Sequence, residues 1–594
     1  TALADVQARK STWTRADLTA AINAALPDHL GLAEGAAVAE LLDGLTDRAL
    51  TFATPMDAAR PGEDALPAAL RLANGESVYQ QPGARLYATP DHVKIEQLLS
   101  AAATQGGGAA RPTHAATRFL ADLTEQGITL GPDQAAAVRG VLTSGARVET
   151  LVGPAGTGKS FVVGALARAW TDPTSNPADA PARRVFGLAT SQVATNVLAG
   201  EGLQTRNVAR WLATQDRLAA PVAERQAVQQ DSAWRLHAGD LVVVDESAMT
   251  DTNALASIHG HVDAAGAKLL LVGDHRQLAA VGAGGGMDLL ANSGPRYELA
   301  DARRFTSGWE REASLRLRAG DETVLRDYHR HGRLLDSGTA TQAEQSAARA
   351  WLADTLTGRR SLLLVDTNEQ AARLSAELRA ELVRLGRVQE DGVALGLDGT
   401  TAGVGDLVQA RRNGWHLAGH DGNRRGPINR DTYQITAVRP DGSLEVATTP
   451  TGDDRDPARM VLPPDYVSEH LALGYATTVH AAQGATVDTA HTVVTTRTGP
   501  AALYVGMSRG RDTNTAHVAT LSTVEDTAHG RADQTIHRDP IAALAGLLDP
   551  DETTGARSAL ATAAHSRRDH GQPCEQSPHR DRLLSFRWCS RGAS

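Results

Sequence analysis

The sequence has little cysteine, few aromatic residues and no long apolar run, and each shortage excludes something. Only two of the 594 residues are cysteines, Cys574 and Cys589, so neither a disulfide framework nor a zinc site is expected. No stretch approaches the roughly 18 apolar residues of a membrane span, and the N-terminus lacks the features of a signal peptide. We therefore predict a globular, cytoplasmic chain without membrane insertion. Because the chain begins with Thr1 and not with methionine, it is compatible with a fragment of a longer protein.

Lysine is also scarce, and one of its four copies lies in a glycine-rich loop. The stretch "GPAGTGKS" matches the pattern GxxxxGK[ST], and the segments on either side have the patterns of a strand and a helix. In such a loop the backbone N–H groups converge on phosphates, the lysine reaches the outer phosphates and the serine hydroxyl ligates Mg²⁺. The sequence therefore predicts ATP and Mg²⁺ as ligands, held by Gly153, Pro154, Ala155, Gly156, Thr157, Gly158, Lys159, Ser160 and Phe161.

The texture of the sequence changes along the chain. Residues 1 to about 100 are rich in Ala and Leu at helical spacing, and "TQGGGAARP" indicates a flexible boundary near 104–112. From about residue 125, short apolar strands alternate with helical segments, which predicts parallel sheets covered on both faces. The pattern breaks between 396 and 464, where short strands and the turn "PDGS" favour a small β-barrel-like insertion. Beyond 550 the chain is polar, and we expect a poorly ordered tail.

Two adjacent acids follow the apolar run "LVVV". Asp245 and Glu246 are thereby placed at the carboxyl end of a buried strand. There Asp245 can hold Mg²⁺ through its water shell, and Glu246 can orient or deprotonate the attacking water. The next strand, "KLLLVGD", delivers Gln277 to its tip, where the amide can reach the γ-phosphate.

Five motifs in order carry a family resemblance. "GPAGTGKS", "VVVDESAM", "VGDHRQL", "YATTVHAAQGATVD" and "LYVGMSRGRD" resemble the motif set of superfamily 1 DNA helicases. More narrowly they resemble the RecD-like, 5′ to 3′ branch, and within it the helicase portion of MobF-type conjugative relaxases (TraA, TrwC and TraI-like proteins) of actinobacterial plasmids. The resemblance covers roughly residues 85–545.

The resemblance implies an α/β fold of two RecA-like lobes. The implied organisation is a helical N-terminal region (1–112), lobe 1 (113–296), the first part of lobe 2 (297–395), an SH3-like β insertion (396–464), the second part of lobe 2 (465–548) and a polar tail (549–594). It also implies three further residues at the nucleotide. Gln134 would pair with the adenine edge, Arg304 would enter from the second lobe, with neighbouring Arg303 as the alternative match, and Arg509 would be the arginine finger.

The same resemblance places single-stranded DNA across both lobes. The residues it implies as DNA contacts are Thr190, Ser191, Gln192, Thr205, Arg210, Trp211, Thr478, His480 and Gln483. Hydroxyl, amide and backbone groups grip phosphates without reading sequence. Trp211, His480 and Tyr475 are the candidates for base stacking, with a position in the core as the equal alternative for Trp211. In the insertion, the turn that is commonly "NGD" in the family has the sequence Asn429, Arg430, Asp431 here.

The nicking activity of MobF proteins needs a three-histidine metal cluster and a nucleophilic tyrosine. His329 and His331 form an isolated HxH pair that favours a structural role, so we expect this chain to lack the nickase. The main hypothesis is thus a monomeric ATP-driven helicase moving 5′ to 3′ on single-stranded DNA and fork duplex, with conjugative coupling and secretion proteins as partners.

Two alternatives remain open at this point. One is a stand-alone RecD-like repair helicase, and the other is a single-strand-binding module with weak turnover. A kinase or transporter would leave "VHAAQGAT" and "YVGMSRGRD" without a purpose.

Overall fold

The structure is a computed structural model that describes residues 1–30, 35–56, 67–70, 83–175, 181–220, 229–280, 282–448, 458–524, 534–548 and 557–571. The chain divides into two compact units, one made of Thr1–Gln97 with Arg557–Ser594 and the other of Leu98–Ala556. The first unit therefore joins residues from the two ends of the sequence.

The N-terminal unit combines helices with a small antiparallel sheet. Its helices are α1 (Ala2–Arg9), α2 (Arg15–Ala25), α3 (Gly35–Leu50) and the start of α4 (Pro90–Ala103), and its sheet has the order β1 (Trp13–Thr14), β3 (Leu86–Ala88), β2 (Thr54–Pro55). Trp13 is fully buried and stacks on Tyr87. Helix α2 begins where Thr14 and Asp17 form a capping box.

The prediction of a disordered tail does not hold for Ala559–Gly571, which form α19. The carboxylate of Glu96 accepts hydrogen bonds from the backbone N–H groups of Ala559 (2.9 Å) and Leu560 (2.8 Å). A carboxylate at a helix N-terminus satisfies free N–H groups and the helix dipole together, so this helix belongs to the N-terminal unit. The remaining predicted tail, 549–556 and 572–594, lies outside the described residues.

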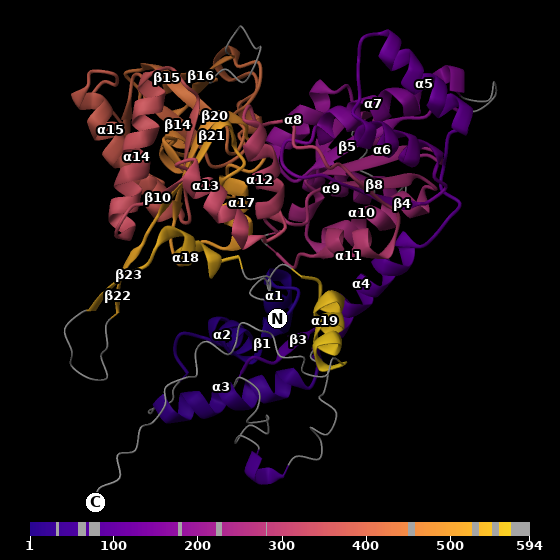
Figure 1. Cartoon of the computed structure of the whole chain (residues 1–594), viewed down its shortest axis with the longest axis horizontal. Helices are drawn as coiled ribbons and strands as arrows, with labels where there is room; N and C mark the ends of the chain where they lie inside the picture. Colours follow the sequence, from indigo (N-terminus) through magenta and orange to yellow (C-terminus); the bar gives the residue numbers. More distant parts are fainter. Residues whose placement is uncertain are drawn as a thin grey trace, which may run out of the picture. The chain divides into compact units, whose positions relative to one another are not determined.

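Lobe 1 is a six-stranded parallel sheet covered by helices, as expected. The strand order is β6 (Gln204–Asn207), β5 (Val185–Ala189), β7 (Leu241–Asp245), β8 (Lys268–Gly273), β4 (Val148–Val152), β9 (Arg296–Glu298). Around it lie α5 (Thr113–Glu125), α6 (Pro132–Thr143), α7 (Lys159–Thr171), α8 (Gln192–Gly200), α9 (Val208–Ala219), α10 (Thr252–Ala264) and α11 (Gly286–Ser293) (Figure 1). Every residue of β4, β5, β7 and β8 is buried, as parallel strands between two helical layers require. The sheet extends to Glu298, slightly beyond the predicted end of the lobe.

Lobe 2 is a second parallel sheet, with the order β10 (Leu334–Asp336), β21 (Gly510–Val518), β20 (Val487–Val494), β11 (Ser361–Val365), β19 (Ala476–Thr478). Its helices are α12 (Gly308–Arg318), α13 (Leu325–Arg330), α14 (Ala340–Leu356), α15 (Asn368–Arg384), α17 (Pro500–Gly506) and α18 (Pro540–Ala545), and a hairpin of β22 (Leu521–Val524) and β23 (Gln534–His537) follows the sheet. Neighbouring residues of β11 face opposite layers. Leu363 packs with α14 and α15, whereas Leu364 packs with Val505 of α17. Two helical layers therefore sandwich the sheet, and both RecA-like lobes are confirmed.

The β insertion is present and antiparallel. A hairpin of β12 (Gly392–Leu395) and β13 (Thr400–Gly403) leads into a five-stranded sheet with the order β17 (Arg459–Leu462), β16 (Leu444–Thr448), β15 (Thr432–Val438), β14 (Leu407–Ala410), β18 (Leu471–Leu473), and α16 (Pro464–His470) precedes β18. The "PDGS" turn joins β15 to β16, closed by a hydrogen bond from the Arg439 N–H to the Ser443 carbonyl (2.9 Å). The sheet continues past the predicted end at 464 because β18 pairs with β14.

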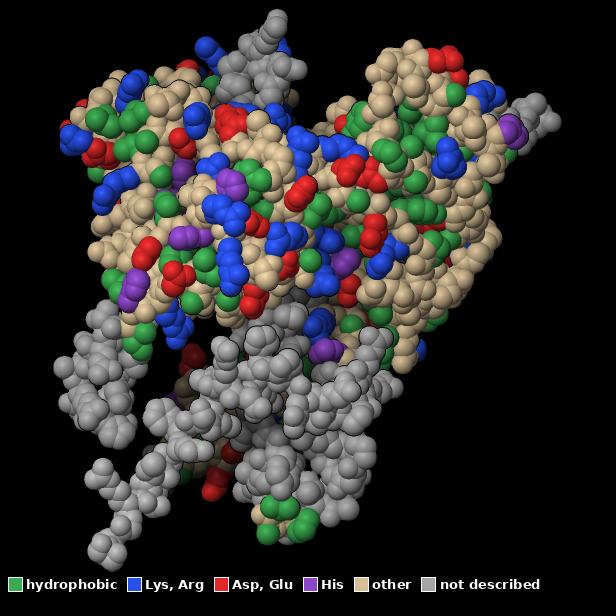
Figure 2. All heavy atoms as spheres, in the orientation of Figure 1, with side chains coloured by type: hydrophobic (Ala, Val, Ile, Leu, Met, Phe, Trp, Pro, Cys, Tyr) green, Lys and Arg blue, Asp and Glu red, His purple; other side chains and the backbone are tan. Residues whose placement is uncertain are grey.

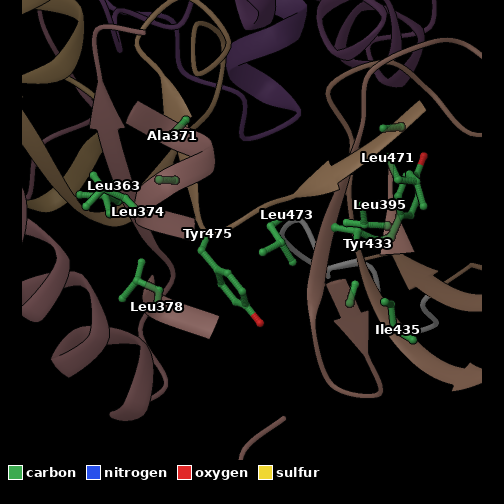
Figure 3. Close-up of a cluster of buried hydrophobic side chains, with 14 of the residues drawn as sticks. Leu363, Ala371, Leu374, Leu378, Leu395, Tyr433, Ile435, Leu471, Leu473 and Tyr475 are labelled. Carbon is green, nitrogen blue, oxygen red and sulfur yellow. The ribbon is translucent and has the colours of Figure 1, made fainter. Parts of the chain in front are cut away.

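One core joins this insertion to lobe 2. Figure 3 shows Tyr475 between Leu374 and Leu378 of lobe 2 and Leu473, Tyr433 and Ile435 of the insertion. Tyr475 also donates a hydrogen bond from its hydroxyl to Asp406. The insertion is therefore packed firmly onto the lobe, and Tyr475 is a core residue, not a platform for stacking bases.

Candidate functional site

A cavity of about 460 Å³ lies at the carboxyl edge of the lobe 1 sheet, where the second lobe meets it. In parallel α/β sheets this edge is the usual place for ligands, because loops after several strands converge there. Its lining comes from both lobes: Ala155, Gly156, Gly158, Lys159, Ser160, Phe161, Val193, Ala194, Val197, Asp245, Glu246, Ala248, Gly273, Asp274, Gln277, Arg303, Arg304, Gln483, Gly484, Thr486, Arg509 and Arg511. All six predicted catalytic residues are among them.

The phosphate loop follows β4 and depends on two glycines in the left-handed region. Gly156 has φ 78° and Gly158 has φ 79°, and a Cβ on Gly156 would lie 2.2 Å from the Cβ of Arg304. Lys159 opens α7 and donates from Nζ to two carbonyls of its own loop, Gly153 (2.7 Å) and Pro154 (3.1 Å). Burial lowers the pKa of Lys159, although Asp274 and Asp245 oppose the shift. The ammonium is thus held within the loop, where a phosphate would meet it.

The two acids after β7 have different environments. Burial raises the pKa of Asp245, with Lys159 opposing, and the Asp245 carboxylate accepts the Glu246 N–H (2.8 Å). Glu246 has φ 49°, a conformation that a non-glycine residue rarely adopts outside functional sites. Burial and the charge of Asp245 raise the pKa of Glu246 to about 7, which suits a general base at neutral pH. Ser191 donates to the Glu246 carboxylate (3.3 Å).

Asp274, at the end of β8, connects the two lobes. Arg318 of α12 forms an ion pair with it (2.7 Å), and the Tyr504 hydroxyl of α17 donates to it (3.3 Å). The Tyr504 hydroxyl also accepts the N–H of Ala155 in the phosphate loop (3.0 Å). Burial alone would raise the pKa of Asp274, but Arg318 outweighs it and the pKa is lowered. Gln277 donates to the same carboxylate (3.3 Å) and lies at the rim of this cluster.

Arg304 and Arg303 point to different surroundings. Arg304 is half-buried and donates to the Ser508 carbonyl of lobe 2 (2.6 Å), and desolvation together with the charge of Arg509 lowers the pKa of Arg304 to about 9. Arg303 instead forms ion pairs with Asp133 (2.8 Å) and Asp301 (3.0 Å) near the surface. The geometry favours Arg304 for contact with a buried phosphate.

Arg509 enters the same cavity from lobe 2. It is 2% exposed, and its guanidinium donates to the Val505 carbonyl (3.0 Å) and to Ser508 Oγ (3.0 Å). Burial lowers its pKa, while Tyr504, Glu246 and Asp274 oppose the shift. Lys159, Arg304 and Arg509 thus bring one buried and two partly buried cations to one cavity, which fits a polyphosphate ligand. Asp245 and Ser160 line the same cavity, and their role as Mg²⁺ ligands stays a prediction.

Gln134 lies next to the phosphate loop but is not among the lining residues. Its amide accepts the Gly131 N–H (3.0 Å) and donates to the Thr157 carbonyl (2.9 Å). Both ends of the amide therefore brace the protein, and contact with adenine stays a prediction that requires exchanging these bonds.

The predicted DNA contacts fall into three groups. Trp211 is fully buried and packs edge-on against His261, so the structure favours its core alternative over stacking on a base. Gln483 lines the nucleotide cavity, and Ser191 bonds to Glu246, so both lie on the nucleotide side in this structure. The others lie near the carboxyl ends of β5, β6 and β19 or in the segments just after them, with His480 and Arg210 exposed: Thr190, Gln192, Thr205, Arg210, Thr478 and His480.

The described residues contain neither a metal-binding cluster nor a membrane-spanning helix. Within those ranges, no three His, Cys, Asp or Glu side chains gather as a metal-binding group, and His331 stacks on Trp309 at 3.9 Å. Within the same ranges, no helix is both long and apolar enough to cross a membrane.

The chain is similar in sequence or structure to several known proteins. Residues 129–339 match the family described as an AAA domain. The chain is 28% identical over 447 residues to the conjugal transfer protein TraA of Agrobacterium fabrum, an alignment that covers 75% of this chain and 37% of that protein. Among solved structures, Pif1 helicase from Candida albicans is similar with a TM-score of 0.42 and 16% identity, over 66% of this chain and 95% of that one. Pif1 helicase from Bacteroides, solved with ADP-AlF3 and ssDNA, has a TM-score of 0.40 and 14% identity, over 66% and 92%.

Two parallel α/β lobes therefore meet at one phosphate-loop cavity, an arrangement that resembles the superfamily 1 helicases whose motifs the sequence carries. By sequence the chain is similar to the TraA conjugal transfer proteins, and it spans 37% of the length of the Agrobacterium relative.

Sequence reasoning missed the connection through Asp274. Asp274 and Tyr504 lie inside recognised motifs, and Arg318 lies in the polar helix α12. No sequence pattern indicated that Arg318 and Tyr504 contact Asp274, because these contacts form only when the two lobes are docked.

Proposed function

We propose that this chain is an ATP-driven motor that moves 5′ to 3′ along single-stranded DNA and unwinds duplex at forks. The observation that carries the proposal is the shared cavity, where Glu246 of lobe 1 and Arg509 of lobe 2 lie within reach of each other's charge. Such a site works only when the lobes are together. Hydrolysis therefore provides a means of opening and closing the seam between them.

In this proposal the side chains have separate roles. The phosphate loop and Lys159 hold the β- and γ-phosphates, and Arg304 and Arg509 stabilise the charge that develops during phosphoryl transfer. Glu246 takes a proton from the attacking water, and Gln277 senses the γ-phosphate from the tip of β8. Mg²⁺, held through Ser160 and Asp245, would neutralise phosphate charge when bound.

The lobe contacts suggest how hydrolysis is transmitted. The Ala155 N–H, which donates to the Tyr504 hydroxyl (3.0 Å), lies in the loop that would hold phosphate. Arg318 holds the neighbouring Asp274 from the other lobe. A change in phosphate occupancy at the loop would therefore act directly on two lobe 2 side chains, and a strand bound across both lobes would be stepped along.

The polarity and the biological role rest on resemblance to relatives. The relation to TraA supports the helicase portion of a conjugal transfer protein. Coupling and secretion proteins as partners, and action as a monomer, are further parts of the proposal. A stand-alone repair helicase is the second candidate. The presence or absence of a relaxase domain in the complete reading frame distinguishes the two.

The test is single-strand-stimulated ATP hydrolysis together with unwinding of forks that carry either a 5′ or a 3′ overhang. We expect stimulation by DNA, unwinding from the 5′ overhang, and loss of both activities in Lys159→Ala. Hydrolysis indifferent to DNA would remove the motor, and DNA binding without turnover would favour the single-strand-binding alternative. Unwinding only from a 3′ overhang would reverse the polarity.

A further inference from the structure

The turn between β14 and β15 contains an arginine in an unusual backbone conformation. Arg430 has φ 74°, the left-handed region that favours glycine. The conformation is fixed by hydrogen bonds on both sides, because the Arg430 N–H donates to the Ala410 carbonyl (2.7 Å) and the Arg430 carbonyl accepts from Gln409 (3.3 Å). A side chain kept at a position where glycine would be relaxed points to a role for that side chain.

The guanidinium of Arg430 is incompletely paired. Its Nη1 is buried and has no hydrogen-bond partner among the residues that the structure describes. Within the same residues Arg430 forms no ion pair, whereas Arg425 of the same turn pairs with Asp431 at 3.6 Å. A buried guanidinium nitrogen without an acceptor is costly, so the arrangement calls for an acceptor from outside the chain.

The neighbouring charges are also positive. Burial and the charge of Arg411 lower the pKa of Arg430, and burial and the charge of Arg430 lower the pKa of His480. Arg411 comes directly after β14 and donates to Asn368 of α15 (2.7 Å). Burial lowers the pKa of Arg411, and the charge of Asp398 opposes that shift. His480 is exposed and follows β19 of lobe 2. The Arg430 N–H donates to Ala410, the residue before Arg411, so the two arginines lie close together, and His480 of lobe 2 is near enough to respond to the charge of Arg430.

We propose that Arg430, Arg411 and His480 form a binding site for a backbone phosphodiester of single-stranded DNA. This inference rests on the proposed function and adds the insertion to the DNA track. A phosphate offers the paired oxygens that a guanidinium fork matches, and it would supply the missing acceptor of Nη1. The site is separate from the nucleotide, because none of the three residues lines the ATP cavity.

The surface charge agrees with a local site and not with a broad basic face. Figure 2 shows arginine and acidic side chains interspersed over the visible face of the described residues, and the whole chain carries a net charge of −10. Binding of a polyanion then depends on defined positions where arginines are not already neutralised. A backbone contact of this kind carries no sequence information, as a motor requires.

The test uses Arg430→Gly, because glycine suits a φ of 74° and the turn is expected to keep its fold. The matched control is Arg424→Gly, which removes an exposed arginine from the same insertion. Affinity for a fluorescent oligo-dT is measured over a salt series, with thermal unfolding as the check on folding. Arg430→Gly is expected to weaken binding roughly tenfold and to reduce the magnitude of the salt slope by about 0.7, while Arg424→Gly leaves both unchanged.

Equal behaviour of the two variants would overturn the site while leaving the motor intact. Loss of DNA-stimulated hydrolysis in the wild-type chain would instead overturn the proposed function. Inorganic phosphate added at constant ionic strength should displace little oligo-dT. Strong displacement that disappears in Arg430→Gly would reassign the site to free phosphate and so contradict the proposal.

Discussion

Each lobe has its own parallel sheet, and the two lobes bring different charged side chains to the cavity between them. Lobe 1 contributes Lys159 and the acids Asp245, Glu246 and Asp274, and each acid lies at or directly after the end of a strand. Lobe 2 contributes Arg509 from the turn after a helix, and Arg318, at a helix end, pairs with Asp274. The lobe 1 side chains therefore reach the cavity from the edge of their own sheet, whereas the lobe 2 side chains reach it only when the two lobes are docked.

This difference separates holding a nucleotide from turning it over. Lobe 1 alone carries the phosphate loop and the base, so it has what binding requires. The charge that develops in phosphoryl transfer is met by arginines whose position depends on the other lobe. Variants in the two lobes should consequently fail in different ways.

The largest effect that separates the lobes is expected for Arg509→Ala. Removal of a buried arginine that faces Glu246 should lower kcat by about 10³-fold while ATP affinity changes little, because Lys159 and the loop remain. Lys159→Ala should lose affinity as well. Isothermal titration with a non-hydrolysable ATP analogue, beside steady-state hydrolysis, measures both, and an equal loss of affinity in both variants would contradict the division between lobes.

A smaller effect, of about 10²-fold in kcat, is expected for Arg304→Ala. Arg304 is half-buried beside the phosphate loop and donates to the Ser508 carbonyl of lobe 2, whereas Arg303 is held by Asp133 and Asp301 at the surface. Arg303→Ala is the matched control and should change hydrolysis only a few-fold. If Arg303→Ala lowered kcat more than Arg304→Ala, Arg303 would be the arginine that contacts phosphate.

Sequence patterns predicted lobe 1 well for a physical reason. Each motif there is a strand followed at once by its functional residue, so Lys159, Asp245, Glu246 and Gln277 reach the cavity through local geometry alone. Arg509 was reached through its motif. Burial of Trp211 and Tyr475, the Tyr504–Asp274–Arg318 cluster and the capture of α19 by Glu96 depend on contacts between distant segments, which no local pattern encodes.

The next test concerns the pH dependence of the lobe 1 base. Glu246 must be deprotonated to accept a proton from water, and its pKa is raised to about 7 by burial and by Asp245. The kcat/KM for ATP should therefore be fully developed above pH 7 and fall about tenfold for each pH unit below it. Initial rates from pH 5.5 to 9 at constant ionic strength measure this limb. Glu246→Gln should retain only a low rate, and its pH profile should lack the fall below pH 7. If the fall persisted in that variant, the titrating group would be another residue.

The smallest effect concerns Ser191, which connects the end of β5 to the base. Its hydroxyl donates to Glu246 (3.3 Å) and accepts the Ala194 N–H (3.1 Å) at the start of α8. The bond to Glu246 stabilises the carboxylate form, so its loss raises the pKa of Glu246. Ser191→Ala should therefore move the acid limb of kcat/KM to higher pH and lower the rate at pH 7 a few-fold.

Ser191→Thr keeps a hydroxyl and is the matched control for both hydrogen bonds. It should retain the wild-type limb, and the loss of the α8 cap in Ser191→Ala should appear separately as a lower Tm. Because Ser191 belongs to a segment that resembles a DNA-contacting motif, DNA that engages this hydroxyl would withdraw it from Glu246 and move the limb in the same direction as Ser191→Ala. An acid limb that DNA shifts in the wild-type chain but not in Ser191→Ala would make this residue the connection between the strand and the base, whereas an identical shift in both would place that connection elsewhere.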